Sequence, residues 1–225
     1  MNPILKRTLT GIAVGAAVIA AILLAPTQVI APAVVVLACL ATIEFLMLLL
    51  KRLPRRASIL TCLLFLLYFV FGEFVISIGL GALEEIAVRH GNMMLLYVVA
   101  IVKFSDVGGF AVGTATSRLM KGGNHKMCPT ISPAKSWEGL CGSILFSCVV
   151  SCAFIPVTHF AIGKALALGV VAALVGTAGD LVESRFKRWV GVKDSSTMKI
   201  TNGMGGILDM LDSLLIAPAV LLFAI

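Results

Sequence analysis

The chain has 225 residues, of which 60% are hydrophobic and only 13% are charged, and its mean hydropathy is +1.07. This composition excludes a water-soluble globular domain and is typical of a protein with several membrane-spanning segments. A net charge of +7 also occurs in nucleic-acid-binding proteins, but here the cations border apolar runs and lack interleaved aromatic residues. The placement of the charge therefore favours anionic groups at a membrane surface as partners, and no nucleic acid.

Seven apolar runs are long enough to cross a bilayer as helices, since a span takes about 20 apolar residues. They lie near 9–25, 28–50, 58–81, 93–115, 138–158, 161–181 and 204–224. No internal repeat or low-complexity linker divides them. We therefore predict an all-α, polytopic integral membrane protein with about seven transmembrane helices. It forms one domain over 1–225, with N-terminal spans in 1–90 and a motif-bearing catalytic part in 91–225.

Lys and Arg alternate between the loops that join these runs. Clusters of cations precede the first run and lie between the second and third, the fourth and fifth, and the sixth and seventh. The alternate loops hold only Arg89 and Lys164. The positive-inside rule then predicts a cytoplasmic N-terminus. We expect an integral protein of the cytoplasmic (inner) membrane whose active site lies on the cytoplasmic face.

Charged side chains also interrupt the apolar runs themselves. Glu44 and Glu73 lie in the second and third runs, and the sequence assigns neither a role. A charge at membrane depth is costly and marks a functional candidate. In the fourth run, Lys103 and Asp106 are three residues apart and share one helix face. The spacing leaves open whether these two side chains pair only with each other or whether Asp106 contacts a ligand.

A motif follows in the loop between the fourth and fifth runs, with the sequence Ser-Pro-Ala-Lys-Ser-Trp-Glu-Gly over 132–139. Ser136 is a suitable N-cap for the next helix, and helix N-termini bind anions. Ser132 and Lys135 lie beside this helix start and are placed to reach a bound anion. The alternative is a capped helix start with no further role.

The most polar stretch runs from Gly179 to Ser213. Asp180, Glu183 and Lys187 recur at three and four residues and share one helix face, and Asp209 and Asp212 do likewise. Three glycines between these groups let backbone approach a phosphate closely: Gly203, Gly205 and Gly206. Carboxylates beside cations and a glycine turn suit Mg²⁺ bridging phosphates. Structural ion pairs inside a helical bundle are the alternative.

This stretch resembles the signature of the phosphatidate cytidylyltransferases, also called CDP-diacylglycerol synthases. The matching positions are Gly179-Asp180, Glu183-Ser184, Lys187-Arg188, Lys193-Asp194, Gly203, Gly205-Gly206, Asp209 and Asp212-Ser213. The motif at 132–139 is similar to a second family motif, with Ala134 replacing a Lys, and Asp106, Phe110 and Gly113 fit the family pattern in the fourth run. The chain departs from the signature at Asn202 (for Pro), Met204 (for His) and Met210 (for Arg), and is about two residues longer after Asp194.

The resemblance implies that CTP and phosphatidic acid react to give CDP-diacylglycerol and pyrophosphate. It implies Mg²⁺, with or without a second cation, held by Asp180 and Asp209. Catalytic roles are expected for Asp180, Asp209, Asp212, Lys187, Arg188, Lys193 and Asp194. Substrate binding is expected for Ser132, Lys135, Ser136, Glu138, Ser184, Gly203, Gly205, Gly206 and Asp106. Membrane lipid surrounds the protein, and a homodimer is one expected assembly.

Three other functions were compared with this one. A CTP-dependent polyprenol or phytol kinase has similar membrane character, but the long signature at 179–213 argues against it. A CDP-alcohol phosphotransferase needs an Asp-Gly-x-x-Ala-Arg run, which this sequence lacks. An ion-coupled transporter would use the intramembrane carboxylates as an ion path, but no pair of spans resembles an inverted repeat.

Overall fold

The computed structural model describes residues 3–53, 58–120, 122–192 and 206–225, with side chains from residue 13 onward. Its helices, in chain order, are α1 (Pro3–Leu24), α2 (Thr27–Leu50), α3 (Ile59–His90), α4 (Asn92–Leu119), α5 (Trp137–Ala153), α6 (Ile155–Thr158), α7 (Ile162–Val190), α8 (Ile207–Leu211), the 3-10 helix η2 (Asp212–Leu214) and α9 (Ala217–Leu222). Two short strands, β1 (Lys126–Cys128) and β2 (Ser132–Ser136), lie between α4 and α5.

Four of the described helices, α2, α3, α4 and α7, are long and apolar enough to cross a membrane. The prediction of a mainly helical membrane protein is confirmed at this level. The apolar helices Ala13–Leu24 and Trp137–Ala153 are shorter. The expected count of seven spans and the cytoplasmic N-terminus stay predictions.

The last apolar run differs from its prediction. Instead of one helix over 204–224, its described part forms the three short pieces α8, η2 and α9. The Asp209 carboxylate accepts the backbone N–H of Gly206 at 3.0 Å and so fixes the start of α8 at that residue. Pro218 lies in the first turn of α9. A proline favours a helix start and cannot lie within a helix without breaking its hydrogen bonds. Polar groups and a proline therefore divide the apolar run at 204–224 into short helices, although its hydropathy predicts one continuous helix.

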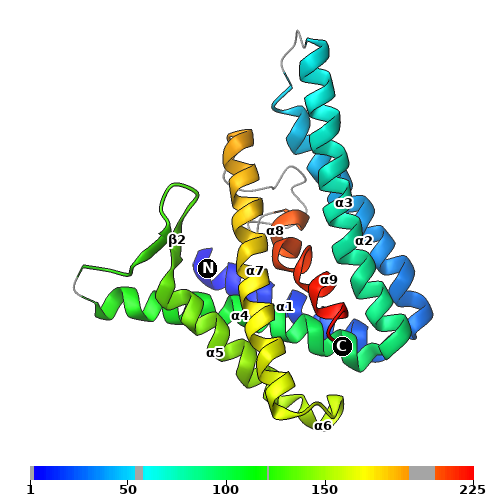
Figure 1. The fold of residues 1–225 in the computed structure, drawn as a ribbon, viewed down its shortest axis with the longest axis vertical. Helices are drawn as coiled ribbons and strands as arrows, with labels where there is room; N and C mark the ends of the chain where they lie inside the picture. The colour runs from blue at the N-terminus through cyan, green and yellow to red at the C-terminus, as the bar shows by residue number, and fades with distance from the viewer. Residues whose placement is uncertain (1–2, 54–57, 121, 193–205) are drawn as a thin grey trace.

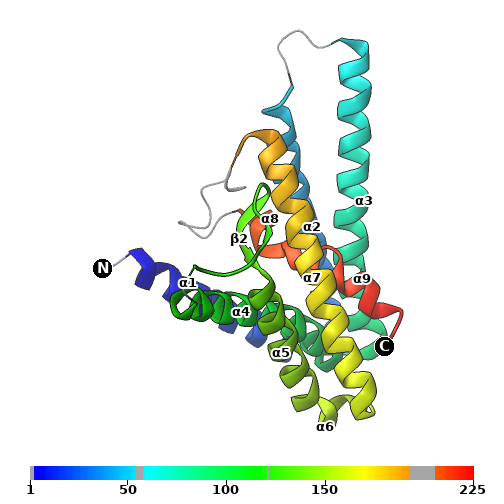
Figure 2. The same ribbon diagram turned by 60° about the vertical axis from the view of Figure 1, so that its left-hand side comes forward.

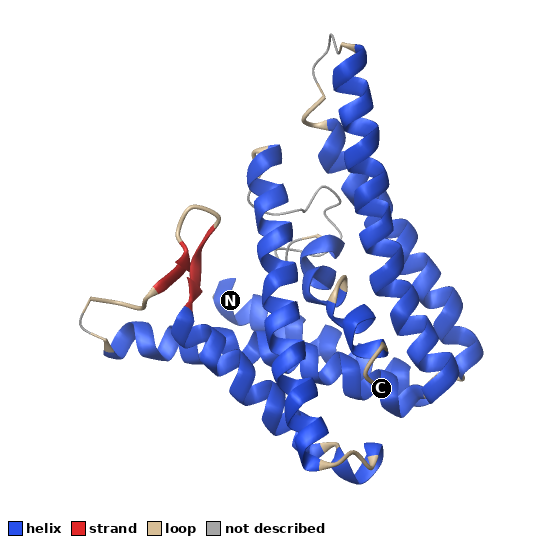
Figure 3. Cartoon of the chain, in the orientation of Figure 1, coloured by secondary structure: helices blue, strands red, loops and turns tan. Residues whose placement is uncertain are grey.

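The second difference from an all-α fold is the hairpin of β1 and β2, which is drawn in red in Figure 3. The strands are antiparallel, with Lys126 opposite Ser136 and Cys128 opposite Ser132, and a register irregularity lies between these pairs. A two-stranded hairpin is marginal by itself. Here β2 runs directly into α5, so the hairpin is attached to the helical body at the start of that helix.

The helices lie in two directions. In Figures 1 and 2, α3 and α7 run along the long axis of the molecule, while α1 and α4 run across it. In Figure 1 the chain's C-terminal pieces, in red, lie between α7 and the α2–α3 pair. Glycines permit the closest approaches: a Cβ at Gly79 of α3 would lie 2.1 Å from the Leu215 carbonyl oxygen, and one at Gly142 of α5 would lie 2.6 Å from the Gly108 carbonyl oxygen.

The core lies where α2, α3, α4 and the C-terminal pieces meet. It is formed by fully buried side chains such as Leu49, Ile86, Ile101 and Leu221. Tyr97 is buried in the same region, and its hydroxyl lies 2.8 Å from Ser151 Oγ, which donates to the Ala165 carbonyl at 2.6 Å. These two bonds connect α4, α5 and α7 at the end of the molecule opposite the β-hairpin. The C-terminal end of α7 reaches the hairpin, where Arg188 Nε donates to the Ile131 carbonyl at 3.4 Å.

Candidate functional site

The start of α5 is built by Ser136, as the sequence predicted. Its Oγ accepts the backbone N–H of Gly139 at 3.1 Å, which is the N-cap bond of the helix. The side-chain amide of Asn124 donates to the same oxygen at 3.2 Å and to the Gly113 carbonyl at 2.6 Å. Ser136 is buried. Through these hydrogen bonds, the cap joins the end of α4, the loop before β1 and the first turn of α5.

Glu138 is held in that first turn by His125, a partner that the sequence did not reveal. The carboxylate lies 2.6 Å from His125 Nδ1 and accepts the His125 backbone N–H at 3.1 Å. The hydrogen bond from the His125 side chain, together with backbone N–H groups, lowers the pKa of Glu138 to about 2. The residue is therefore an anion at neutral pH, and both of these bonds are made by its Oε1, whereas its Oε2 has no hydrogen-bond partner among the described residues.

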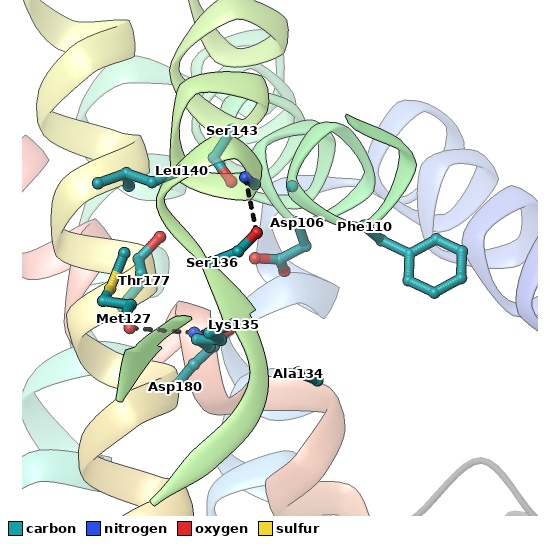
Figure 4. Close-up of a pocket in the computed structure, with 12 residues that line it drawn as sticks. Asp106, Phe110, Met127, Ala134, Lys135, Ser136, Leu140, Ser143, Thr177 and Asp180 are labelled. Atoms are coloured by element: carbon teal, nitrogen blue, oxygen red, sulfur yellow. Dashed lines mark hydrogen bonds and ion pairs between the residues drawn. The ribbon is translucent and has the colours of Figure 1, made fainter. Parts of the chain in front are cut away.

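Lys135 brings the two sequence motifs together. Its ammonium group donates to Asp180 Oδ2 at 2.7 Å and to the Thr177 carbonyl at 3.1 Å, as Figure 4 shows. Both side chains are about one-fifth exposed. The motif at 132–139 and the motif that begins at 179 are thus parts of one site, although 45 residues separate the two partners along the chain.

A second lysine joins the two halves of the longer motif. Lys187 Nζ lies 2.9 Å from Glu183 Oε2 on its own helix and 2.5 Å from Asp209 Oδ1 on α8. Glu183 is buried, and the exposed fractions of the other two side chains are near one-eighth. Asp209 also accepts the Gly206 backbone N–H, so it caps α8 while facing Lys187. Glu183 and Lys187 pair on one face of α7, as predicted, whereas Asp180 contacts Lys135 of β2 instead.

The third group gathers around Lys103 of α4. Its ammonium donates to the Met210 carbonyl and to Ser213 Oγ, both at 2.9 Å, and lies 3.5 Å from Asp106 Oδ2 and 4.0 Å from Asp212 Oδ1. Ser213 Oγ in turn donates to Asp106 Oδ2 at 2.9 Å. Lys103 and Asp106 do pair, but sequence reasoning missed their contact with the C-terminal segment. The sequence did contain a signal for this contact, because a lysine within an apolar run, such as Lys103, needs polar partners from other helices.

Two hollows open beside these groups. A cavity of about 200 Å³ is lined by polar side chains that include Asp106, Lys135, Ser136 and Asp180, together with Thr177 and small or apolar neighbours. Figure 4 shows Asp106, Lys135, Ser136 and Asp180 close together, whereas Phe110 points away from them. A second, more apolar groove of about 330 Å³ lies between α2, α3 and α7. Its lining includes Phe45, Tyr68, Phe71, Val75, Val182, Phe186, Trp189, Glu183 and Asp212.

The remaining predicted site residues lie around these groups. Ser132 begins β2 and Ser184 lies on α7, and neither lines the 200 Å³ cavity formed by the described residues. Arg188 is exposed at the end of α7, where its Nε donates to the Ile131 carbonyl at 3.4 Å and so connects to the hairpin. Gly206 is the N-cap of α8. Lys193, Asp194, Gly203, Gly205 and Met204 lie outside the described residues.

The two glutamates within the apolar helices α2 and α3 accept hydrogen bonds from other elements. Glu44 is fully buried in α2, and its Oε2 accepts the backbone N–H of Leu208 at 2.9 Å. It therefore holds the first turn of α8, directly before Asp209. Glu73 accepts the hydroxyl of Thr42 at 2.8 Å, which joins α3 to α2. The sequence showed that Glu44 needed a partner but gave no means of identifying α8, which lies 164 residues away.

Within the described residues, no set of three or more His, Cys, Asp or Glu side chains is placed to hold a metal ion. Mg²⁺ does not require such a set, because it commonly binds one or two carboxylates and completes its shell with substrate phosphates and water. Asp180 Oδ1 is buried and has no hydrogen-bond partner among the described residues, while its Oδ2 faces Lys135. An oxygen of this kind fits a hard cation, so the donor chemistry is compatible with Mg²⁺.

The sequence that carries this site is similar to known proteins. A model of the "Cytidylyltransferase family" matches residues 67–225, which include every element of the site described above except α2. Proteins named phosphatidate cytidylyltransferase are similar over the same part. One from Mycobacterium bovis is 43% identical over 131 residues, which are 56% of this chain and 39% of that protein. One from Haemophilus influenzae is 39% identical over 134 residues, 56% of this chain and 43% of that protein.

A third relative with the same name, from Staphylococcus aureus, is 39% identical over 142 residues, or 62% of this chain and 52% of that protein. The similarity thus spans about two-fifths to one-half of the length of these curated relatives. The family model covers well over half of the present chain, and its matched region contains Lys135, Asp180, Lys187 and Asp209. The chain therefore belongs to the cytidylyltransferase family.

Proposed function

We propose that this chain transfers a cytidylyl group from CTP to phosphatidic acid, giving CDP-diacylglycerol and pyrophosphate for phospholipid synthesis. The observation that carries the proposal is the pair of hollows on two faces of α7. Thr177 and Asp180 line the polar cavity, whereas Val182 and Glu183 line the apolar groove. A hydrophilic nucleotide and an amphiphilic lipid need different environments that meet at one reaction centre, and α7 separates two such environments by a single helix.

The polar cavity suits the CTP phosphates. Lys135 supplies an ammonium group at its wall, and the capped N-terminus of α5 beside Ser136 favours anions. The apolar groove suits one acyl chain of the lipid, since it is lined by side chains such as Phe71 and Val75. Asp212 lines the same groove, so the groove leads from apolar α3 to the acidic segment after α8. Both substrates would then present phosphate to the region between Asp180 and Asp212.

The reaction is a displacement at phosphorus. An oxygen of the lipid phosphate forms a bond to the α-phosphorus of CTP, and the bond from that phosphorus to the oxygen bridging to the β-phosphate breaks. Pyrophosphate leaves with the electron pair of the broken bond. Such a step needs alignment and charge neutralisation more than it needs a covalent nucleophile. Lys135, Lys187 and Arg188 are the described cations placed to provide this neutralisation, and Lys193 is expected to join them.

Mg²⁺ would be held by Asp180 and Asp209, with Asp212 close behind, and would supply electrostatic stabilisation of the reacting phosphates when bound. The lysines that face Asp180 and Asp209 hold the carboxylates in place meanwhile. Ser132, Ser136, Ser184 and the glycines at 203, 205 and 206 are proposed to position phosphate oxygens. The site would lie on the cytoplasmic face of the inner membrane, where CTP is available. We propose a homodimer as its assembly.

The proposal is tested with the purified full chain in lipid nanodiscs that contain phosphatidic acid, supplied with Mg²⁺ and CTP labelled at either the α- or the γ-phosphate. We expect the α-label to enter the lipid and the γ-label to leave as pyrophosphate. A γ-label that enters a polyprenol or phytol supplied in its place would instead establish a kinase. Absence of lipid labelling from both CTP preparations would refute cytidylyl transfer by this chain.

A further inference from the structure

The Ser136 hydroxyl receives hydrogen bonds from two nitrogens that can only donate. The backbone nitrogen of Gly139 lies 3.1 Å from Ser136 Oγ, and the side-chain nitrogen of Asn124 lies 3.2 Å from the same oxygen. A serine hydroxyl has two lone pairs and one hydrogen. Both lone pairs are therefore occupied, and the hydrogen points along the remaining direction around the oxygen.

A second contact fixes the orientation of the Asn124 amide. Its nitrogen also donates to the Gly113 carbonyl at 2.6 Å, a bond that the amide oxygen could not make because both atoms would be acceptors. Asn124 Oδ1 is buried and has no hydrogen-bond partner among the described residues. A buried acceptor without a donor is destabilising, so the amide keeps this orientation for the two bonds that its nitrogen donates. Asn124 thus presents only a donor to Ser136.

The hydrogen left over on Ser136 belongs to a side chain at the wall of the polar cavity of about 200 Å³. Ser136 is 4% exposed, and its hydrogen is paired with no acceptor in the part of the chain that the structure describes. Lys135 lines the same cavity, and within those residues it uses two of its three ammonium hydrogens, on Asp180 and the Thr177 carbonyl. Figure 4 shows both side chains beside the cavity. Two such donors suit a ligand that offers oxygen acceptors, as phosphate does.

We propose that Asn124 is a positioning residue that fixes the Ser136 hydroxyl as a hydrogen-bond donor to a phosphate oxygen in the polar cavity. Ser136 touches the ligand, and Asn124 acts through Ser136. That the phosphate belongs to CTP rests on the proposed function, whereas donation to a phosphate does not. The N-cap bond by itself occupies one lone pair and leaves the hydroxyl free to rotate. Asn124 occupies the second lone pair and removes that freedom.

Substitutions at position 124 change the partner of the hydroxyl. Asn124→Asp places an oxygen where the amide nitrogen lies, so the hydroxyl turns and donates to it instead of to the ligand. Asn124→Ala removes the donor and lets the hydroxyl rotate among about three staggered positions. Each change is also made in Ser136→Ala, which lacks the hydroxyl. That background shows by itself any effect of the added charge or of an altered loop.

Asn92→Asp is the matched control for the substitution. Asn92 Nδ2 also donates to a backbone carbonyl, that of Ala25 at 2.8 Å, so the change breaks the same kind of bond and adds the same charge. Asn92 begins α4, and Gly113 lies 21 residues further along that helix, which is about 32 Å. The control therefore reports these two effects far from the cavity.

The experiment measures equilibrium binding of labelled CTP, and separately of labelled pyrophosphate, to the full chain in nanodiscs of neutral lipid with Mg²⁺ and no phosphatidic acid. Asn124→Asp should weaken both ligands at least about tenfold more in the wild type than in Ser136→Ala, because only the wild type loses a hydrogen bond to a charged group. Asn124→Ala should weaken both up to about threefold in the wild type and leave Ser136→Ala unchanged. Asn92→Asp should bind as the wild type does.

Three results would overturn the inference. Effects of equal size with and without the Ser136 hydroxyl would show that Asn124 acts by charge or by structure alone. Weaker binding of CTP with unchanged binding of pyrophosphate would place the hydroxyl against the base or the sugar. A wild type that does not bind pyrophosphate would have no phosphate for the hydroxyl to contact. If thermal unfolding shows that Asn124→Asp does not fold, Asn124→Ala with and without Ser136→Ala decides the same question.

The readout needs no product, so this inference and the proposed function can fail separately. A chain that shows the expected coupling in pyrophosphate binding but forms no CDP-diacylglycerol refutes the proposed function and leaves the role of Asn124 intact. A chain that forms CDP-diacylglycerol without the coupling refutes only the role of Asn124.

Discussion

Lys135 Nζ lies 2.7 Å from Asp180 Oδ2, and this contact joins the β-hairpin to the middle of α7. Lys135 is the last residue but one of β2 and Asp180 lies just past the midpoint of α7, so their contact does not follow from local structure. The pair places an ammonium group and a carboxylate at the wall of one polar cavity.

Asp180→Asn and Asp209→Asn should each lower kcat by at least about 100-fold, since each removes a charge that aligns cations on the reacting phosphates. Folding should be retained. The measurement is CDP-diacylglycerol formation together with thermal unfolding in the same nanodiscs. Glu85→Gln is the matched control, because Glu85 pairs with Arg89 on a more exposed surface, at 2.6 Å.

Those two variants also decide between catalysis and structure. If the carboxylates served only as ion pairs within the fold, removing one partner of a buried pair would cost roughly 3–5 kcal/mol of stability. Unfolded variants would therefore favour a structural role. Folded variants with full activity would contradict the metal assignment.

Val182→Trp should raise the KM for long-chain phosphatidic acid and leave the KM for CTP unchanged. Val182 lines the apolar groove and is 55% exposed, so an indole there fills space that the acyl chain is proposed to use. Leu174→Trp is the control, because Leu174 is 46% exposed on the same helix but does not line the groove. Equal effects of the two substitutions would show that added bulk on α7, rather than groove occupancy, explains the change.

Ser136→Ala should destabilise the fold by about 1 kcal/mol, the usual cost of losing an N-cap side chain. It should also raise the KM for CTP, since the cap orients the backbone N–H groups at the start of α5 beside the cavity. Ser58→Ala removes the equivalent N-cap of α3, where Ser58 Oγ accepts the Thr61 N–H at 3.2 Å in an exposed position. A CTP effect in Ser58→Ala of the same size would show that the KM reports stability alone.

The wild type should be active although it carries Met204 where the family signature has His. A phosphate monoester has a second pKa of about 6, so phosphatidic acid is mostly dianionic at neutral pH and its attacking oxygen holds no proton. The rate should fall as the pH drops below about 6, because the lipid phosphate then gains a proton. A wild type that is silent at every pH and is rescued by Met204→His would refute this reasoning and identify an obligatory base.

Single cysteines at Ala134 and Glu85, each in a cysteine-free background, should react with an impermeant reagent from opposite sides of the membrane. Ala134 is exposed in the hairpin, within a predicted cytoplasmic loop. Glu85 lies near Arg89, at the loop that the positive-inside rule predicts to be external. The six native cysteines are all free, so the background requires no disulfide to be broken. Labelling of both positions from one side would contradict the predicted orientation.

The sequence alone determined the features that depend on local chemistry. Continuous apolar runs specify long membrane helices, because a span must satisfy its backbone hydrogen bonds internally. Ser136 could be identified as an N-cap from its place before an apolar run, and the structure confirms the cap. Family membership also followed from residues close together in the chain, since the spacing of Asp180, Lys187 and Asp209 lies within one stretch of 35 residues.

Tertiary structure decided which of these groups meet. Glu44 holds α8 from a distance of 164 residues along the chain, and Lys103 reaches Ser213 across 110, so no local pattern contained either pairing. The last apolar run shows the same limit. Hydropathy predicted one helix there, but contacts with Lys187, Lys103 and Glu44 hold its polar groups at the site and divide it into α8, η2 and α9. Burying an ionised group without a partner costs more than breaking a helix into shorter pieces, and the available partners are known only once the helices pack.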